Sequence, residues 1–227
     1  MQKDVLYLID ILFFFFFFLY DRLAKPSEWE RPENPPYAYW LYYINANVQA
    51  LNTFRRSRGM NVFDFVPHSG QTGDFSHLVA GYLTARHIVH GTMLMSHPVL
   101  SYLYYISQVG ITVSPLSESS VHVLCYDDDP FPAFFRRGLN VTLSTDSPLL
   151  QHRTEEPLIE EYALAFQAWK LSLVDMYEIA RNSVVNSSFT TQEKEAWIGK
   201  KFWSAHLNKK GKSLSLFLFS SSILKRH

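Results

Sequence analysis

Two histidines and one carboxylate each follow a short run of strand-forming residues, and their types suit metal or acid–base chemistry. They are His68, His90 and Asp146. Imidazole nitrogens and carboxylate oxygens bind hard or borderline divalent ions and also move protons to and from a bound water. A lone histidine is more often structural, and an Asp before Ser-Pro is also typical of a helix N-cap. The set therefore predicts a metal or acid–base site, with helix capping as the alternative for Asp146.

The order of elements along the chain decides whether these groups can meet. Helical spacing of apolar residues predicts helices over residues 37–58, 73–85, 98–110, 131–138, 157–171 and 173–185. Short apolar runs predict strands at residues 62–66, 88–89, 111–113 and 140–145. Strands that alternate with helices imply right-handed crossovers and a parallel sheet.

Each predicted strand runs into a polar residue, namely His68, His90, Ser114 or Asp146. In βα barrels the catalytic groups lie at these C-terminal strand ends. A complete barrel has about eight strands and about 250 residues, which is more than the predicted strands can build. We therefore expect an α/β fold that forms half of a TIM-type (β/α)8 barrel.

Composition excludes several classes of protein. The formal net charge is +0, so the chain carries no basic excess for nucleic acid. Its single cysteine, Cys125, excludes an internal disulfide framework and a multi-cysteine zinc site, and it suits a reducing compartment. We expect a globular protein of the cytosol.

The two ends differ from the middle in composition. The apolar run within residues 9–20 is shorter than the roughly 20 residues of a spanning helix, and no small-residue cleavage site follows it, so a membrane or secretory role is not expected. The glycosylation sequons at Asn140 and Asn186 are then incidental. We expect residues 1–26 and 204–227 to be non-domain sequence that flanks a catalytic unit at 27–203.

Long stretches of the middle carry a specific resemblance. They read NPPYAYWLYYINANVQALNTFRRSRG, PHSGQTGDFSHLVAGYLTARHIVHG, HPVLSYLYYISQVGITVSPLS, FPAFFRRGLNVTLSTDSPL and TEEPLIEEYALAFQAWKLSLVDMYEIARNSV. The chain from about residue 30 to residue 203 resembles the C-terminal part of the catalytic barrel of AMP deaminase, in the metal-dependent adenosine/AMP deaminase family. The resemblance implies the C-terminal half of a metallo-dependent hydrolase barrel.

The resemblance also implies a reaction and site roles. Members of the family hydrolyse AMP to IMP and ammonia, a step of purine salvage, with zinc lowering the pKa of the attacking water. The family motifs place zinc ligands at His68 and Asp146 and the group that handles the water proton at His90. Substrate contacts fall on residues 71 and 147–150, which are Gln71, Ser147, Pro148, Leu149 and Leu150. The family forms tetramers, so a homo-oligomer is expected.

Departures from the family pattern put activity in doubt. Gln71 replaces the glutamate that protonates the purine, and Ser147 replaces an aspartate that contacts it. Leu150 replaces a glutamine that helps to hold the nucleotide. The sequence also contains no His-x-His pair, which supplies the other two zinc ligands of the family. Two alternatives to an active deaminase therefore remain: a silent relative that acts by binding or oligomerisation, and an unstable fragment of a longer enzyme.

Overall fold

The computed structural model describes residues 23–116 and 128–199, in two compact units. The first unit comprises the chain up to Tyr104 together with Val109–Thr112, and the second comprises Tyr105–Gln108 and the chain from Val113. Cys125, both apolar ends and most of the two predicted flanking segments lie outside the described residues. Within the described ranges, no helix is both long enough and apolar enough to cross a membrane.

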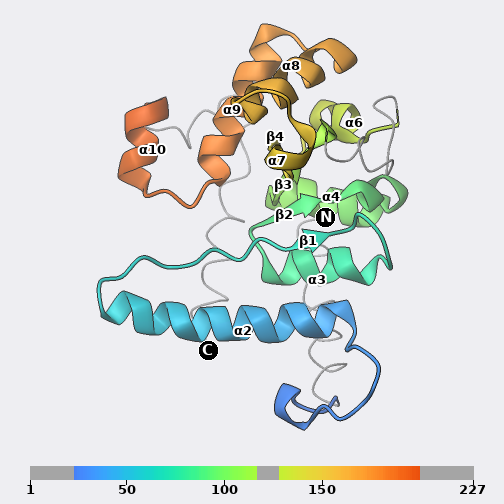
Figure 1. Cartoon of the computed structure of the whole chain (residues 1–227), viewed down its shortest axis with the longest axis vertical. Coiled ribbons are helices and arrows are strands. Elements are labelled where there is room, and N and C mark those ends of the chain that lie inside the picture. The colour runs from blue at the N-terminus through green and yellow to red at the C-terminus, as the bar shows by residue number, and fades with distance from the viewer. Residues whose placement is uncertain (1–22, 117–127, 200–227) are drawn as a thin grey trace. The chain divides into compact units, whose positions relative to one another are not determined.

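The elements follow one another in strand-and-helix order, as Figure 1 shows by colour. The first unit contains η1 (Pro26–Glu28), α2 (Tyr37–Ser57), β1 (His68–Ser69), α3 (Ser76–Thr84), β2 (His87–His90) and η2 (Thr92–Ser96). Both units contribute to α4 (Pro98–Ser107) and β3 (Gly110–Val113). The second unit contains α6 (Phe131–Arg136), β4 (Val141–Leu143), α7 (Pro148–Gln151), α8 (Pro157–Trp169), α9 (Leu173–Asn186) and α10 (Thr191–Ile198).

The strands form a parallel sheet in the order β1-β2-β3-β4. In the first unit, β1 pairs with β2 and β2 pairs with β3, both in parallel, with His68 opposite Val89. In the second unit, the Ser144 N–H after β4 donates to the Val113 carbonyl of β3 at 3.0 Å. The strand order equals the chain order, as in successive βα units of a barrel. This confirms the predicted α/β half-barrel.

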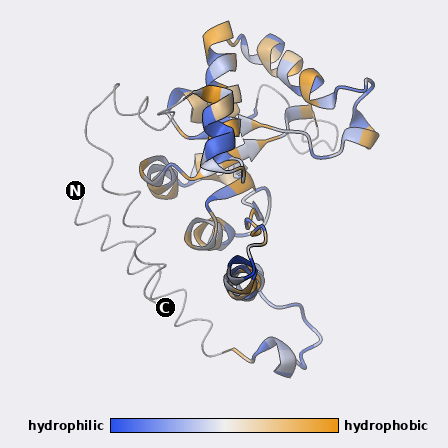
Figure 2. Cartoon of the chain, turned by 90° about the vertical axis from the view of Figure 1, so that its left-hand side faces the viewer, coloured by the Kyte–Doolittle hydropathy of each residue, from blue (hydrophilic) through white to orange (hydrophobic). Residues whose placement is uncertain are grey.

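Helix α2 packs on α3 in the first unit. The helix begins after Pro36 and ends before Gly59. The φ of Gly59, 65°, lies in the left-handed region that glycine adopts without strain. Ala38 and Leu41 form a small apolar cluster with Ala80 of α3. The two helices lie side by side in Figure 1, and in Figure 2 α2 carries both hydrophilic and hydrophobic colours. The mixed colouring is that of an amphipathic helix.

The predicted strand at residues 62–66 is wrong, because the described strand is only His68–Ser69. The Asn52 side chain of α2 makes the backbone hydrogen bonds to residue 63 that a neighbouring strand would otherwise make. Its amide nitrogen donates to the Phe63 carbonyl at 2.7 Å, and its amide oxygen accepts the Phe63 N–H at 2.8 Å. Residue 63 therefore has its backbone groups satisfied by a helix side chain, and ladder pairing begins only at the Pro67 carbonyl, which accepts from Val89.

The second unit buries β4 under its helices. Val141 of β4 and Ile179 of α9 are both fully buried core residues of this unit. Helices α9 and α10 both begin with a capping box, Ser172 with Asp175 and Thr190 with Glu193. In each box a hydroxyl accepts an N–H of the first turn and the acid accepts the N-cap N–H, which fixes the helix start. Helix α10 was not predicted, because its apolar residues have no clear helical period.

The two sequon asparagines pair with each other. The Asn140 amide donates to the Asn186 amide oxygen at 2.8 Å, and the Asn186 amide donates back at 3.0 Å. Asn140 also donates to the Gln108 carbonyl at 3.1 Å. The Asn140 amide nitrogen uses both of its hydrogens in these bonds, so a glycan on it would remove one of them. The two residues therefore have a structural role in tying the start of β4 to the end of α9.

Candidate metal centre

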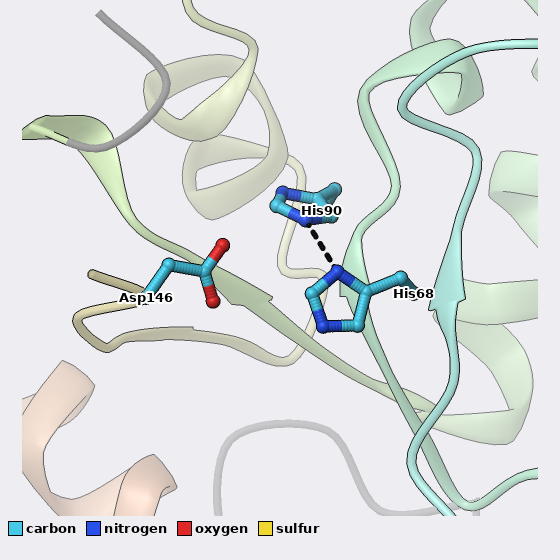
Figure 3. Close-up of side chains that lie close together, drawn as sticks. All are labelled: His68, His90 and Asp146. Carbon is cyan, nitrogen blue, oxygen red and sulfur yellow. Dashed lines mark hydrogen bonds between the residues drawn. The ribbon is translucent and has the colours of Figure 1, made fainter. Parts of the chain in front are cut away.

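His68 and His90 meet at adjacent strand ends. His68 opens β1 and is exposed, whereas His90 closes β2 and is only 3% exposed. His68 Nδ1 and His90 Nε2 are 2.9 Å apart, and the ring centroids are 4.9 Å apart at an interplanar angle of 59° (Figure 3). At this distance one nitrogen carries the proton and the other accepts it. The two imidazoles can thus exchange a proton directly.

The turn after β2 holds His90 in a rare backbone conformation. His90 has a φ of 78° and Gly91 a φ of 69°, both in the left-handed region. A Cβ at Gly91 would lie 3.2 Å from Ile88 Cδ1 and 3.3 Å from Ile111 Cγ2, so a side chain fits poorly there. A left-handed residue other than glycine costs about 1–2 kcal/mol. Such strain is typical of functional sites, where the surrounding packing enforces it.

The backbone around His68 is held from two sides. The Tyr37 hydroxyl donates to the His68 carbonyl, and the Ser69 hydroxyl donates to the His77 carbonyl at 2.6 Å. Burial raises the pKa of the Tyr37 hydroxyl, which therefore stays a donor at neutral pH. Gly70 has a φ of 73°, and a Cβ there would overlap Leu78 Cδ2 at 2.3 Å. The strand therefore turns sharply after Ser69, as Pro67 and Gly70 predict.

Asp146 lies between β4 and α7 and is exposed. Helix α7 begins at Pro148 with Ser147 as the N-cap residue, and no side chain caps the helix. The N-cap residue of α7 is thus Ser147, and Asp146 stands one residue before it, directly after the end of β4.

His68, His90 and Asp146 form a candidate metal site in the described residues. One ligand atom from each lies within 4.8 Å of the others (Figure 3). Two imidazole nitrogens and one carboxylate oxygen are donor types that zinc and other divalent metal ions bind. The three candidate residues thus lie close together, and their donor chemistry fits a divalent metal ion.

The predicted substrate residues lie on the loops that follow β1 and β4. Gln71 is half-buried in the loop after β1. On α7, Leu149 is 98% exposed and Leu150 is 86% exposed. The next residue, Gln151, has a buried Oε1 atom without a hydrogen-bond partner in the described residues. The predicted substrate contacts, Leu150 among them, stay a prediction, and in this short helix the amide oxygen of the neighbouring Gln151 is buried.

Arg55 at the end of α2 is held within the first unit: it donates to the Asn61 carbonyl, and its guanidinium lies 4.4 Å from the Phe63 ring centroid. His152, to which the sequence assigned no role, has a fully buried side chain between two glutamates. Its partners are eight and nine residues away along the chain, a spacing that no local motif marks.

Comparisons with known proteins show which family the chain resembles. The AMP deaminase family model matches residues 18–213. The chain is 55% identical to AMP deaminase of Saccharomyces cerevisiae over 181 residues and 48% identical to AMP deaminase 3 of Homo sapiens over 183 residues. These matches cover 80% and 81% of this chain. The chain spans 22% and 24% of the two relatives' lengths.

Solved structures show the same fold. An adenine deaminase from Arthrobacter aurescens superposes with a TM-score of 0.58 at 17% identity, over 85% of this chain and 51% of that one. An amidohydrolase from Burkholderia ambifaria with bound zinc gives a TM-score of 0.57 at 18% identity, over 94% of this chain and 56% of that one. About half of each neighbour is matched, as expected for half of a barrel. On the strength of its family model and these relatives, the chain belongs to the AMP deaminase family.

Proposed function

We propose that this chain carries part of the active site of an AMP deaminase, which hydrolyses AMP to IMP and ammonia. The observation that carries the proposal is the group of His68, His90 and Asp146 at parallel strand ends. Family membership supplies the substrate and the reaction. Because the chain spans 22% of the yeast relative's length, the activity of the complete enzyme goes beyond the matched region and belongs to the proposal.

His68 and Asp146 would hold a zinc ion, and His90 would handle the proton. When bound, zinc supplies Lewis acidity that lowers the pKa of a water. His90 Nε2 faces His68 Nδ1 at 2.9 Å and belongs to a side chain that is 3% exposed, so it can hold a proton out of contact with bulk water. Gln71 can orient a substrate by hydrogen bonds, but its amide delivers no acidic proton.

A catalytically silent relative is the second candidate. Gln71 and Ser147 favour it, because both replace acidic residues of the family pattern with neutral ones. Loss of a general acid costs about 10²- to 10⁴-fold in rate. Such a chain would act by binding or by joining oligomers. The exposed apolar side chains Trp40, Ile44 and Leu51 on α2 support self-association, and the neutral net charge and single cysteine support a cytosolic protein.

A chimera tests the activity. Residues 23–199 would replace the matched segment of the Saccharomyces cerevisiae AMP deaminase, whose remaining chain supplies the rest of the catalytic domain. Ammonia release from AMP would be measured with zinc supplied. We expect slow turnover, a gain of about 10²- to 10⁴-fold from Gln71→Glu, and a further gain from Ser147→Asp.

The chimera also separates the two candidates. An active parent chimera that gains rate with Gln71→Glu supports a deaminase weakened at one position. A folded, zinc-loaded chimera that stays silent with both acids restored would show that the segment lacks a working site. The unaltered yeast enzyme and the same enzyme with its own glutamate changed to glutamine are the matched controls.

A further inference from the structure

A buried histidine lies between two carboxylates beneath the loop that follows β4. His152 Nδ1 lies 3.3 Å from Glu160 Oε2, and His152 Nε2 lies 3.3 Å from Glu161 Oε1. The histidine side chain and that of Glu161 are both 0% exposed. His152 Nε2 also lies 2.8 Å from the Thr145 hydroxyl. We call these four residues, Thr145, His152, Glu160 and Glu161, the His152 network.

Both carboxylates of the network are also anchored to backbone. Glu161 Oε2 accepts the N–H of Leu116, just beyond β3, at 2.9 Å. Glu160 Oε1 accepts the N–H of Arg153 at 3.1 Å and of Thr154 at 2.6 Å. Hydrogen bonds from Thr154, with smaller ones from Arg153 and His152, lower the pKa of Glu160 against an opposing burial effect. The network therefore connects the segment after β3, the end of β4 and the start of α8.

Stability gives little reason to bury such a network. Polar groups taken out of water lose hydration that their contacts with one another only partly return, and a well-packed apolar cluster of the same volume is often as stable. Buried polar networks do fix one geometry of the groups that they join. Here the joined group is Thr145, whose neighbour along the chain is Asp146.

We infer that His152 and Glu161 are positioning residues, which hold Thr145 and thereby set the direction of the Asp146 carboxylate. The inference rests on the proposed role of Asp146 as a metal ligand. The contact between the Thr145 hydroxyl and His152 Nε2 constrains the residue directly before Asp146, which is itself exposed. Partners behind metal ligands orient them, and losing one typically costs about 10- to 100-fold in metal affinity.

Cobalt binding to the full chain tests the inference without any turnover. Co²⁺ replaces zinc at such sites and reports ligand geometry through its visible absorption. We expect Thr145→Val to weaken Co²⁺ binding by about 10-fold or more and to alter the spectrum, because it removes the hydroxyl while leaving the contacts of His152 with both glutamates intact. His152→Ala would have the same effect or a larger one. His97→Ala, a histidine that bonds the Met93 carbonyl at 2.9 Å, is the matched control and leaves binding unchanged.

Two amide variants separate positioning from packing. Glutamine at position 152 places its amide nitrogen near the former Nε2 and keeps the bond to Thr145, whereas asparagine replaces only the Nδ1 side. We expect His152→Gln to bind Co²⁺ close to the wild-type affinity and His152→Asn to bind about 10-fold more weakly. A merely structural role would lower the melting temperature of both variants and leave the affinity and spectrum of the folded protein unaltered.

The variant Asp146→Asn distinguishes failure of the positioning role from failure of the proposed ligand role of Asp146. If Asp146→Asn weakens Co²⁺ binding while Thr145→Val and His152→Ala do not, the positioning role is wrong and Asp146 remains a ligand. If Asp146→Asn binds Co²⁺ as the wild type does, the ligand assignment itself is wrong. Weakening by all three variants, with recovery in His152→Gln, supports both.

Discussion

At the scale of single residues, the metal-site candidates could be predicted and their supports could not. His68, His90 and Asp146 stand at strand ends, and strand ends can be recognised from local sequence. The groups proposed to position Asp146 depend on contacts that are distant in the chain: Glu161 accepts the N–H of Leu116, 45 positions away. A buried hydrogen bond of this kind depends on tertiary packing, which local patterns do not encode.

The partly buried His87 should make the free energy of unfolding depend on pH. It opens β2, and its Nε2 lies 2.9 Å from the Thr112 hydroxyl. Burial lowers the pKa of His87 below its usual 6.5, against a smaller opposing effect of Asp64. The unfolded chain therefore binds the proton more readily. Above about pH 6.5 His87 is neutral in both states and its contribution to the free energy of unfolding is fully present. As the pH falls from about 6.5 towards the lower pKa of the folded state, the unfolded state takes up the proton first and this contribution is lost.

The measurement is urea denaturation between pH 8 and pH 5. The wild type should lose stability in this range more steeply than His87→Gln, because glutamine can keep a hydrogen bond to Thr112 but does not titrate. Equal slopes for the two proteins would mean that His87 is not the source. His97→Gln serves as a histidine control outside the His87 contact.

Tyr104 predicts the strength of one buried hydrogen bond. Its ring is fully buried, and its hydroxyl donates to the Leu78 carbonyl of α3 at 2.9 Å. Burial strongly raises the pKa of this hydroxyl, so it is a donor at all working pH values. Tyr104→Phe should lower the free energy of unfolding by about 1–2 kcal/mol. Tyr177→Phe, at a residue that is 77% exposed, should change it by much less. Equal effects would contradict the assignment.

At the scale of elements, the helices that were predicted lie within a few residues of their expected bounds, whereas α10 was missed and one predicted strand is absent from the described residues. Helix α2 was expected over residues 37–58 and spans Tyr37–Ser57, because its apolar spacing and its stop at Gly59 are local signals. The strand expected at residues 62–66 fails because Asn52 satisfies the Phe63 backbone from a helix. Apolar residues do alternate in this segment, but the backbone of Phe63 bonds to the Asn52 side chain and not to a neighbouring strand.

The hydrogen bonds of Asn52 to residue 63 should contribute measurably to stability. Asn52→Ala leaves both backbone groups of Phe63 without this partner and should lower the free energy of unfolding by about 2–3 kcal/mol. Gln49→Ala on the same helix removes only a 3.5 Å side-chain contact to Asn45 and is the control. Chemical denaturation of both variants measures the difference. A loss no larger in Asn52→Ala than in Gln49→Ala would show that residue 63 is held by other contacts.

At the scale of the whole molecule, the half-barrel was predictable and its surface was not. Alternating strands and helices determine a parallel sheet, and four strands account for about half of an eight-stranded barrel. The helical period of α2 gives no sign of which face is covered. In the structure Ala38 and Leu41 are buried, whereas Trp40, Ile44 and Leu51 are exposed.

The exposed apolar face of α2 predicts self-association. Trp40→Glu combined with Ile44→Lys should reduce association at micromolar concentration, because both side chains are more than 40% exposed and contribute apolar surface. Sedimentation velocity measures the effect. Val99→Lys, at a residue that is 62% exposed on α4, is the control and should leave association unchanged. Association that survives the double change would place the contact on another face.

We propose that this chain carries part of a zinc site in which His68 and Asp146 are ligands and His90 handles the proton. The most direct measurement takes the chimera with Glu at position 71 and Asp at position 147, and determines bound zinc per subunit together with ammonia release from AMP. Asp146→Asn should lose both zinc and activity, whereas His90→Gln should keep zinc and lose about 10²- to 10⁴-fold in rate. Zinc retained in Asp146→Asn, or full activity in His90→Gln, would contradict the account.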